Sequence, residues 1–176
     1  EAGEGLERLL HRRGEAVGGI INGLNADLVN PRTDRYIVRQ VDQGSIADRS
    51  ANRTALRAQF GLPDDDGPIV AMVTRLTEQK GIDLVLGALP ELIAAQAQLI
   101  VLGDGDRWLR DELGRLEGEY QSHVRLAARF DEGLAQRIYA GADMFLMPSR
   151  YEPCGLGQLI AMRYGTIPIG RRTGGL

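Results

Sequence analysis

The sequence predicts an α/β fold with a doubly wound, mostly parallel Rossmann-like sheet. From residue 68 onward, short apolar segments alternate with segments of helical periodicity, and the connections between them are short. The apolar segments are nearly continuous, as in strands that are buried on both faces. A repeated order of strand and helix with short connections indicates a parallel sheet with helices on both faces. Glycines and charged residues gather after the strands, where ligands bind in such sheets.

Five strands and four intervening helices follow from this periodicity. The strands are predicted at 68–74, 97–102, 123–128, 143–147 and 166–169. The helices are predicted at 82–95, 106–120, 132–142 and 155–164. An earlier helix is predicted to be capped by Ser45, to carry Ile46 and Leu56 on its buried side, and to end at Gly61.

The chain is expected to contain parts of two domains. Residues 1–24 are expected to end the preceding domain or lead out of it, and they include the turn signal Asn22-Gly23. Residues 25–176 are expected to form the Rossmann-like domain, incomplete at its C-terminus. Because the chain begins with Glu and ends within a loop-like stretch, we expect a fragment of a longer protein, truncated at both ends.

Composition excludes several classes of protein. The chain is 43% apolar and 26% charged, so it can bury a core and is not a disordered tail. A net charge of −3 gives no sign of a general nucleic-acid or membrane-surface binder, and no apolar run is long enough to span a membrane. The single cysteine, Cys154, excludes an internal disulfide and fits a reducing compartment. We therefore expect a cytoplasmic protein, or a plastid one if the source is a photosynthetic eukaryote.

Two cations follow the first strand, and a glycine-rich turn opens the helix after the fourth. Arg75 and Lys80 can converge on one anion, the guanidinium as a fork and the ammonium as a point charge. Lys80 is the one lysine beside twenty arginines. A functional role for this lysine and chance explain that count equally well. Gly155 and Gly157 open a helix whose free N–H groups and positive dipole end suit a phosphate. These residues favour a diphosphate cradle over a surface ion pair and a tight turn.

Other motifs at this edge carry weaker signals. The Gly-Asp-Gly at 103–105 begins like a dinucleotide fingerprint, but Trp108 stands where the third glycine belongs. Asp104 and Asp106 have a spacing that some sugar transferases use for a metal, although a turn is favoured in a loop of this fold. Because no histidine lies near Cys154 in sequence, we interpret it as a small loop residue rather than a nucleophile.

Several motifs, in this order, resemble the bacterial and plastid starch/glycogen synthases. They are RLTEQKGID at 75–83, YAGAD at 139–143, PSRYEPCGL at 148–156, YGT at 164–166 and RRTGGL at 171–176. The resemblance runs from about Val17 to the last residue, with Asn22-Gly23 as the family's domain crossover. It implies the C-terminal, nucleotide-binding half of a retaining glucosyltransferase of the GT-B fold. Such enzymes move glucose from ADP-glucose to the non-reducing end of an α-1,4-glucan such as glycogen or starch.

The resemblance also assigns roles to individual residues. Arg75 and Lys80 match the family's pair on the nucleotide diphosphate. Glu152 matches the acidic residue that holds glucose hydroxyls and steadies the charged transition state, and Phe130 falls where a Tyr usually stacks on adenine. The remaining matched residues lie in two loops near the sugar and phosphates: Cys154, Gly155, Leu156 and Gly157 in one, and Thr173, Gly174 and Gly175 in the other. No metal or cofactor is implied, because ADP-glucose is a substrate.

The chain departs from the family pattern at a few positions. Gly157 stands where Thr is common, which removes a hydroxyl near the phosphates. Arg129-Phe130 stands where Gly-Tyr is usual, so stacking can survive but a phenol hydrogen bond cannot. Ile160 stands where many related transferases have a second Glu, which fits the starch/glycogen synthases better than the broader GT-B group. Since the acceptor domain is absent from the sequence, we expect the fragment alone to be inactive.

Three other interpretations stay open at this point. A GT-B transferase can use UDP-glucose or another acceptor, and a comparison of ADP and UDP binding would separate the donors. A non-catalytic nucleotide- or glucan-binding module would be expected to have lost Arg75, Lys80 or Glu152, all of which are present. A purely structural domain is disfavoured because the special residues crowd one edge of the sheet. The sequence carries no signal for an oligomeric state.

Overall fold

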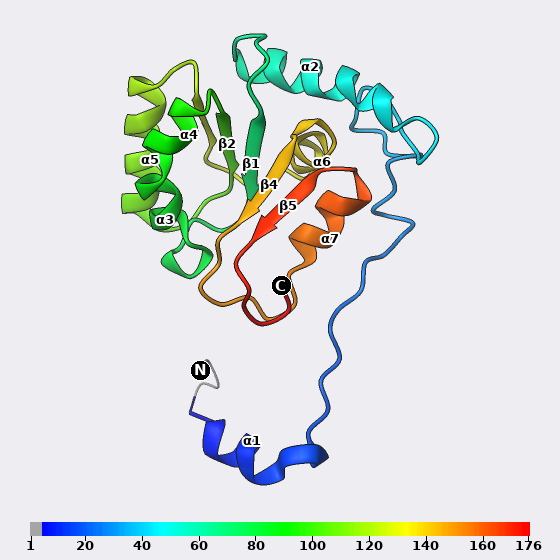
Figure 1. Ribbon diagram of the computed structural model, residues 1–176, viewed down its shortest axis with the longest axis vertical. Helices are drawn as coiled ribbons and strands as arrows, with labels where there is room; N and C mark the ends of the chain where they lie inside the picture. The colour runs from blue at the N-terminus through cyan, green and yellow to red at the C-terminus, as the bar shows by residue number, and fades with distance from the viewer. Residues whose placement is uncertain (1–4) are drawn as a thin grey trace.

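The strands form a single five-stranded parallel sheet with helices on both faces (Figure 1). The computed structural model describes residues 5–176. The strand order is β3-β2-β1-β4-β5, and every neighbouring pair is parallel. The strands are β1 (Ile69–Val73), β2 (Gln98–Leu102), β3 (Val124–Ala127), β4 (Met144–Met147) and β5 (Ile167–Gly170). The chain thus builds outward in both directions from β1, which confirms the predicted doubly wound fold.

Helices and short 3-10 turns make the connections. They are α2 (Arg49–Phe60), η3 (Glu78–Lys80), α3 (Ile82–Gly87), α4 (Leu89–Ala94), α5 (Arg107–Glu119), α6 (Glu132–Gly141) and α7 (Leu156–Arg163). Among residues 5–176, no helix has both the length and the apolar character needed to cross a membrane.

The N-terminal segment lies apart from the sheet. Helix α1 (Glu7–Arg13) and the 3-10 turn η1 (Gly14–Ala16) bury no residue, and an extended stretch joins them to the rest of the chain (Figure 1). Residues 1–4 of the predicted 1–24 segment lie outside the described residues.

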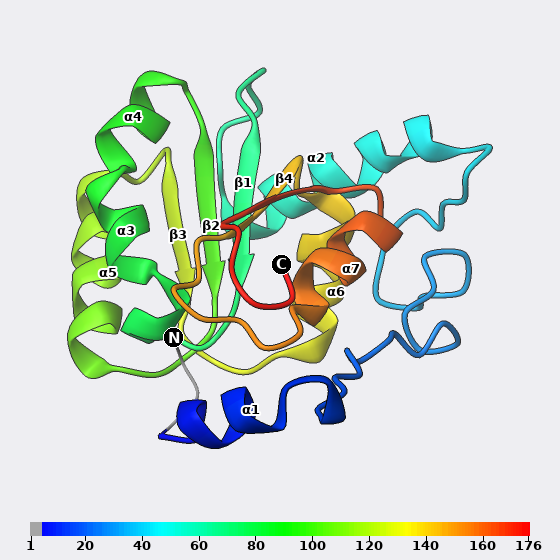
Figure 2. The ribbon, with the colours of Figure 1, turned by 60° about the horizontal axis from the view of Figure 1, so that its bottom comes forward.

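Alternate residues of the central strands enter cores on opposite faces of the sheet. Val70 and Met72 of β1 pack in a cluster with residues of α3, α4 and α5. Ile69 and Ala71 of the same strand pack in a second cluster with residues of α2 and α6. Figure 2 shows these two groups of helices on the two sides of the sheet. Both faces of the strand are therefore apolar, which explains the continuous apolar run in the sequence.

The helix predicted over 82–95 is two short helices. Helix α3 ends at Gly87, and α4 begins at Leu89 with Pro90 in its first turn. Because proline has no N–H and its ring clashes with the carbonyl one turn earlier, one continuous helix through Pro90 is disfavoured. The prediction of a single helix was wrong.

The predicted helix cap at Ser45 was also wrong. The Ser45 hydroxyl oxygen accepts from the Asp42 N–H at 2.9 Å, the hydroxyl donates to the Asp42 carboxylate at 2.9 Å, and it caps no helix. A 3-10 turn, η2 (Ile46–Asp48), leads into α2, and Ile46 is 49% exposed rather than buried. The short Asp42–Ser45 turn takes the hydroxyl that a cap would need.

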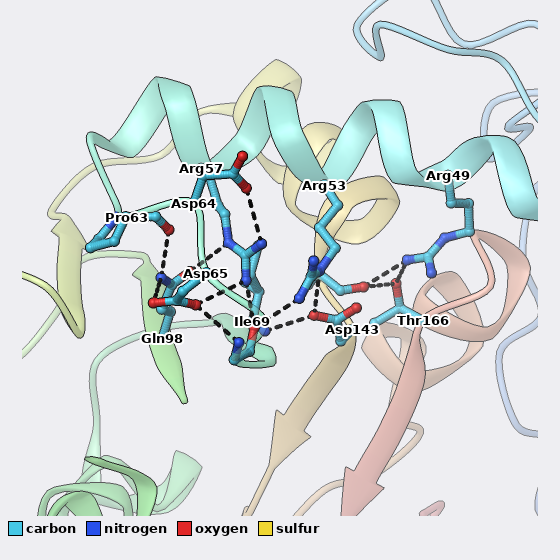
Figure 3. Close-up of polar contacts among 12 residues, drawn as sticks. Arg49, Arg53, Arg57, Pro63, Asp64, Asp65, Ile69, Gln98, Asp143 and Thr166 are labelled. Carbon is cyan, nitrogen blue, oxygen red and sulfur yellow. Dashed lines mark hydrogen bonds and ion pairs between the residues drawn. The ribbon is translucent and has the colours of Figure 1, made fainter. Parts of the chain in front are cut away.

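Three arginines of α2 reach the amino ends of the strands (Figure 3). Arg49, Arg53 and Arg57 follow one another at four-residue intervals and so share one face of the helix. Arg49 donates to the Ala142 carbonyl and the Thr166 hydroxyl, both at 2.6 Å. Arg53 donates to the Asp143 carboxylate at 3.0 Å and to the Gly67 carbonyl at 2.8 Å. Arg57 donates to the Gln98 side chain at 2.8 Å and to the Gly67 carbonyl at 2.5 Å. This arginine row ties α2 to the starts of β1, β2, β4 and β5.

Arg57 is the most buried member of the arginine row. Its side chain is 3% exposed, and carboxylates of Asp64 and Asp65 lie 3.5 and 3.4 Å from its guanidinium. Gln98, which is fully buried, uses its amide oxygen to accept from Arg57 and its amide nitrogen to donate to the Pro63 carbonyl at 2.8 Å. A buried guanidinium is tolerated because its N–H groups are paired in this way.

We predict that Arg57→Met lowers the free energy of unfolding by about 3 kcal/mol, because the change leaves the buried Gln98 amide oxygen unpaired and removes the cation beside Asp64 and Asp65. Arg115→Met on α5 is the matched control, since Arg115 also pairs with two carboxylates but its side chain is 57% exposed. The control should lose less than about 1 kcal/mol. Urea unfolding followed by circular dichroism measures both values. Equal losses in the two variants would contradict a special role for the arginine row.

Candidate functional site

A cavity of about 500 Å³ opens at the carboxyl ends of β1 and β4, against the beginning of α7. Most of the predicted site residues line it: Arg75, Lys80, Glu152, Cys154, Gly155, Leu156 and Gly157. Its wall also contains Asn22 from the extended N-terminal segment and apolar residues such as Phe145 and Met147. The structure thus brings together residues from the loops after β1 and β4, as the parallel sheet predicts.

Lys80 and Glu152 form an ion pair across the two loops. Lys80 Nζ lies 2.5 Å from Glu152 Oε2, and the Ser149 hydroxyl donates to the same oxygen at 3.1 Å. Glu152 is 7% exposed, so these contacts compensate a largely desolvated carboxylate. The loops approach closely at Gly81, where φ is +73° and a Cβ would lie 2.5 Å from the Pro148 carbonyl oxygen. A glycine is required at that position.

Arg75 supplies an unneutralised positive charge at the mouth of the cavity. Its side chain is exposed, and no carboxylate within residues 5–176 pairs with it. Lys80, by contrast, is already engaged by Glu152. The two cations therefore differ: among the described residues Arg75 has no carboxylate partner, whereas Lys80 is paired with Glu152.

The beginning of α7 presents backbone N–H groups to the cavity. Gly155 precedes the helix in the left-handed conformation at φ +73°, and no side chain caps the helix. The N–H groups of the first turn have no partner within a helix, so they and the positive end of the helix dipole favour an anion there.

Gly157 keeps the floor of the cavity tightly packed. A Cβ at this position would lie 3.0 Å from the Phe145 ring and 3.3 Å from the Met147 sulfur. A Thr at this position, as the resemblance leads one to expect, would require both side chains to shift. The departure at Gly157 therefore fits the residues beneath it.

Thr173, Gly174 and Gly175 lie behind the Glu152 loop rather than in the cavity wall. The Gly175 N–H donates to the Glu152 carbonyl at 2.9 Å, and the Thr173 hydroxyl donates to the Arg150 carbonyl at 3.3 Å. Gly174 has φ +54°, and a Cβ there would collide with the Glu152 carbonyl oxygen. In this structure these residues support the backbone that carries Glu152.

Phe130 lies outside the cavity. Its side chain is 93% exposed, in the connection between β3 and α6. The neighbouring Asp131 caps α6 by accepting from the Leu134 N–H at 2.8 Å, which holds this connection at the helix start. The role of Phe130 as a stacking surface for adenine stays a prediction.

The Gly-Asp-Gly segment at 103–105 is not the expected turn: Gly105 forms an isolated parallel bridge with Leu76, so the connection runs beside the loop after β1. Asp104 Oδ1 accepts from the Gly105 N–H at 2.9 Å and lies 3.4 Å from Arg110. Both glycines lie against backbone atoms of the loop after β1. A Cβ at Gly103 would collide with the Thr74 carbonyl oxygen, and a Cβ at Gly105 would collide with the Leu76 carbonyl oxygen. The glycines let the loops after β1 and β2 meet.

Sequence reasoning missed two residues of the site. Ser149 is 2% exposed and donates to Glu152; its position two residues after β4 and three residues before an acidic residue was an available signal. Asn22 lines the cavity from a segment that the sequence analysis treats as a turn signal and domain crossover, not as part of the site. No local pattern predicts that contact.

Comparison with known proteins shows similarity to sugar-transferring enzymes. The family model described as glycosyl transferases group 1 matches residues 67–176. The chain is 49% identical over 175 residues to a glycogen synthase of Bacillus cereus, covering 99% of this chain and 37% of that relative. The chain therefore spans little more than a third of the length of such curated relatives.

Solved structures show the same likeness. The catalytic domain of Starch Synthase IV from Arabidopsis thaliana, bound to ADP and acarbose, superposes with a TM-score of 0.92 at 40% identity, covering 99% of this chain and 36% of that one. Sucrose-phosphate synthase from Thermosynechococcus elongatus superposes with a TM-score of 0.65 at 29% identity, covering 97% and 39%. The resemblance to starch/glycogen synthases is confirmed, and the chain belongs to the glycosyl transferases of group 1.

Proposed function

We propose that this chain is the donor-binding part of a retaining glucosyltransferase. The whole protein would transfer glucose from ADP-glucose to the non-reducing end of an α-1,4-glucan. The observation that carries the proposal is the cavity in which two cations, the beginning of α7 and a buried carboxylate converge. The similarity to glycogen synthases, and to a starch synthase whose structure holds ADP and acarbose, supports the donor and the acceptor.

The diphosphate would bind between Arg75, Lys80 and α7. A lysine ammonium has three N–H donors, and Glu152 uses one of them, so two are available to phosphate oxygens. Arg75 would add a charged fork, and the first turn of α7 would add backbone N–H groups. When the bond between glucose and diphosphate breaks, negative charge develops on the leaving group, and these fixed donors would stabilise it.

Glu152 would act on the sugar. Its Oε2 accepts from Lys80 and Ser149, whereas Oε1 has no protein partner within residues 5–176. That oxygen would accept a glucose hydroxyl, and the negative charge would stabilise the positive character that the sugar gains in the transition state. A retaining transfer of this kind needs no dedicated protein base, so no further residue is required for proton removal.

Three smaller parts complete the proposal. Residues 1–24 would lead out of an acceptor-side domain, in keeping with an α1 that buries no residue here. Transfer would need that domain, so the 176-residue chain alone would bind the nucleotide without catalysing transfer. The whole protein would act in the cytoplasm, where one free cysteine among residues 5–176 is compatible with a reducing environment.

The proposal predicts that the chain binds ADP more tightly than UDP and that the whole protein transfers glucose from ADP-glucose to glycogen. Isothermal titration of the chain with each nucleotide and a radiolabelled glucose assay measure the two properties. Preference for UDP would point to another donor, and ADP binding by a whole protein without transfer would indicate a non-catalytic module. Binding of neither nucleotide would overturn the diphosphate cradle.

Lys80→Gln should lower kcat/KM for ADP-glucose by about 100-fold or more, because it removes a charged donor from the leaving group. Arg107→Gln on α5 is the control, since Arg107 is a cation whose side chain is 85% exposed. The control should change kcat/KM by less than about twofold, as expected for exposed charges outside the site. Equal effects of the two variants would contradict the role of Lys80.

Gly174→Ala should lower transfer by about tenfold or more, because the added Cβ would collide with the Glu152 carbonyl and displace that loop. Gly114→Ala is the control: Gly114 lies within α5 with nothing near its Cβ position, so alanine should keep activity and slightly stabilise the helix. Steady-state rates and thermal midpoints of both variants test this. Full activity in Gly174→Ala would show that the close approach to Glu152 does not matter.

A further inference from the structure

We infer that Arg150 is a positioning residue, which sets the distance between Lys80 and Glu152 by bracing the two loops that carry them. The inference rests on the proposed function, in which Lys80 and Glu152 act on the donor. Lys80 and Glu152 are 72 positions apart in the sequence and meet only because the loops after β1 and β4 lie side by side.

Arg150 joins these loops by its backbone and by its side chain. Its N–H donates to the Gln79 carbonyl at 2.8 Å, and the Gln79 amide donates in return to the Tyr151 carbonyl at 3.2 Å. Its guanidinium donates to the Glu78 carbonyl at 2.7 Å and to both carboxylate oxygens of Asp83 at 2.6 Å. One side chain therefore spans from the Glu152 loop to η3, which carries Lys80, and to the first turn of α3.

The brace depends on the shape of the guanidinium group. Two parallel N–H donors meet both oxygens of Asp83 while one of the same nitrogens also reaches the Glu78 carbonyl. Lysine keeps the charge but lacks the fork, so it cannot reproduce this set of bonds. Hydrogen bonds from Arg150 also hold the pKa of Asp83 below its ordinary value.

Arg150 acts from outside the cavity. Neither it nor Asp83 lines the cavity, and their side chains are 41% and 30% exposed. An ion pair with this exposure adds little to the stability of the fold. The carbonyl of Arg150 also accepts from Thr173, so three loops of the site meet at this residue. The arrangement fits a residue that orients the site without touching the substrate.

The test compares Arg150→Lys and Asp83→Asn in the whole protein, with Arg115→Lys as the matched control. Arg115 makes a comparable two-bond pair with Glu112 at 3.0 and 2.8 Å, but on α5 and away from the cavity. We expect Arg150→Lys and Asp83→Asn each to lower kcat about 10- to 100-fold with KM changed less than about threefold, because a small misplacement of reacting groups is costly. Thermal midpoints should shift no more than in the control, by about 2 °C or less.

The double variant separates a shared brace from two independent effects. If Arg150 and Asp83 act through one contact, the double variant is no slower than the slower single variant. Unchanged kcat in both single variants, or multiplied losses in the double variant, would overturn the inference. Loss of cooperative unfolding in both single variants would also overturn it, because Arg150 would then be an anchor of the fold.

The same assays distinguish failure of this inference from failure of the proposed function. Wild-type transfer from ADP-glucose, loss of activity in Lys80→Gln and full activity in Arg150→Lys would reject the brace alone. A wild-type protein that neither binds ADP nor transfers glucose would reject the proposed function and the brace together.

Discussion

The sheet depends on the arginine row of α2, which holds the amino ends of four strands. Parallel strands start side by side, so their first carbonyls and side chains need partners at one edge. Arg49, Arg53 and Arg57 supply those partners from a single helix face. Because removal of the Arg57 guanidinium would leave the buried Gln98 amide oxygen unpaired, this edge contains at least one contact that is costly to lose.

The opposite edge is built in another way. There the loops are joined mainly by backbone and side-chain hydrogen bonds between one loop and the next, and by glycines that permit close approach. Gly81 faces Pro148, and Gly174 faces Glu152, each at a distance that no Cβ would allow. The contacts of α2 fix the amino ends of the strands, and the closely packed loops lie at their carboxyl ends. In the proposed function, fixed charges and N–H groups in those loops would provide the preorganisation on which electrostatic catalysis depends.

The local pattern predicted the elements well where burial alone decides them. The apolar runs of β1 and β2 face two cores, so their position in the sequence was sufficient. The local pattern was a less reliable predictor where a single residue interrupts it. Pro90 divides a helix whose apolar spacing continues on both sides, and Ser45 bonds to Asp42 instead of capping a helix. At Pro90 a missing N–H donor ended the helix, and at Ser45 a side-chain hydrogen bond prevented a cap, although the apolar spacing favoured a helix in both places.

The amino-acid pattern alone was enough to predict the order of strands and helices, the parallel sheet, and the edge at which Arg75, Lys80 and the α7 glycines would gather. Which side chains touch became known from the packed fold. The contact between Lys80 and Glu152, the support from Ser149 and the bridge from Arg150 to Asp83 join loops far apart in the chain. These loops meet because β1 pairs with β4, and strand order is set by packing of the whole sheet rather than by any local pattern.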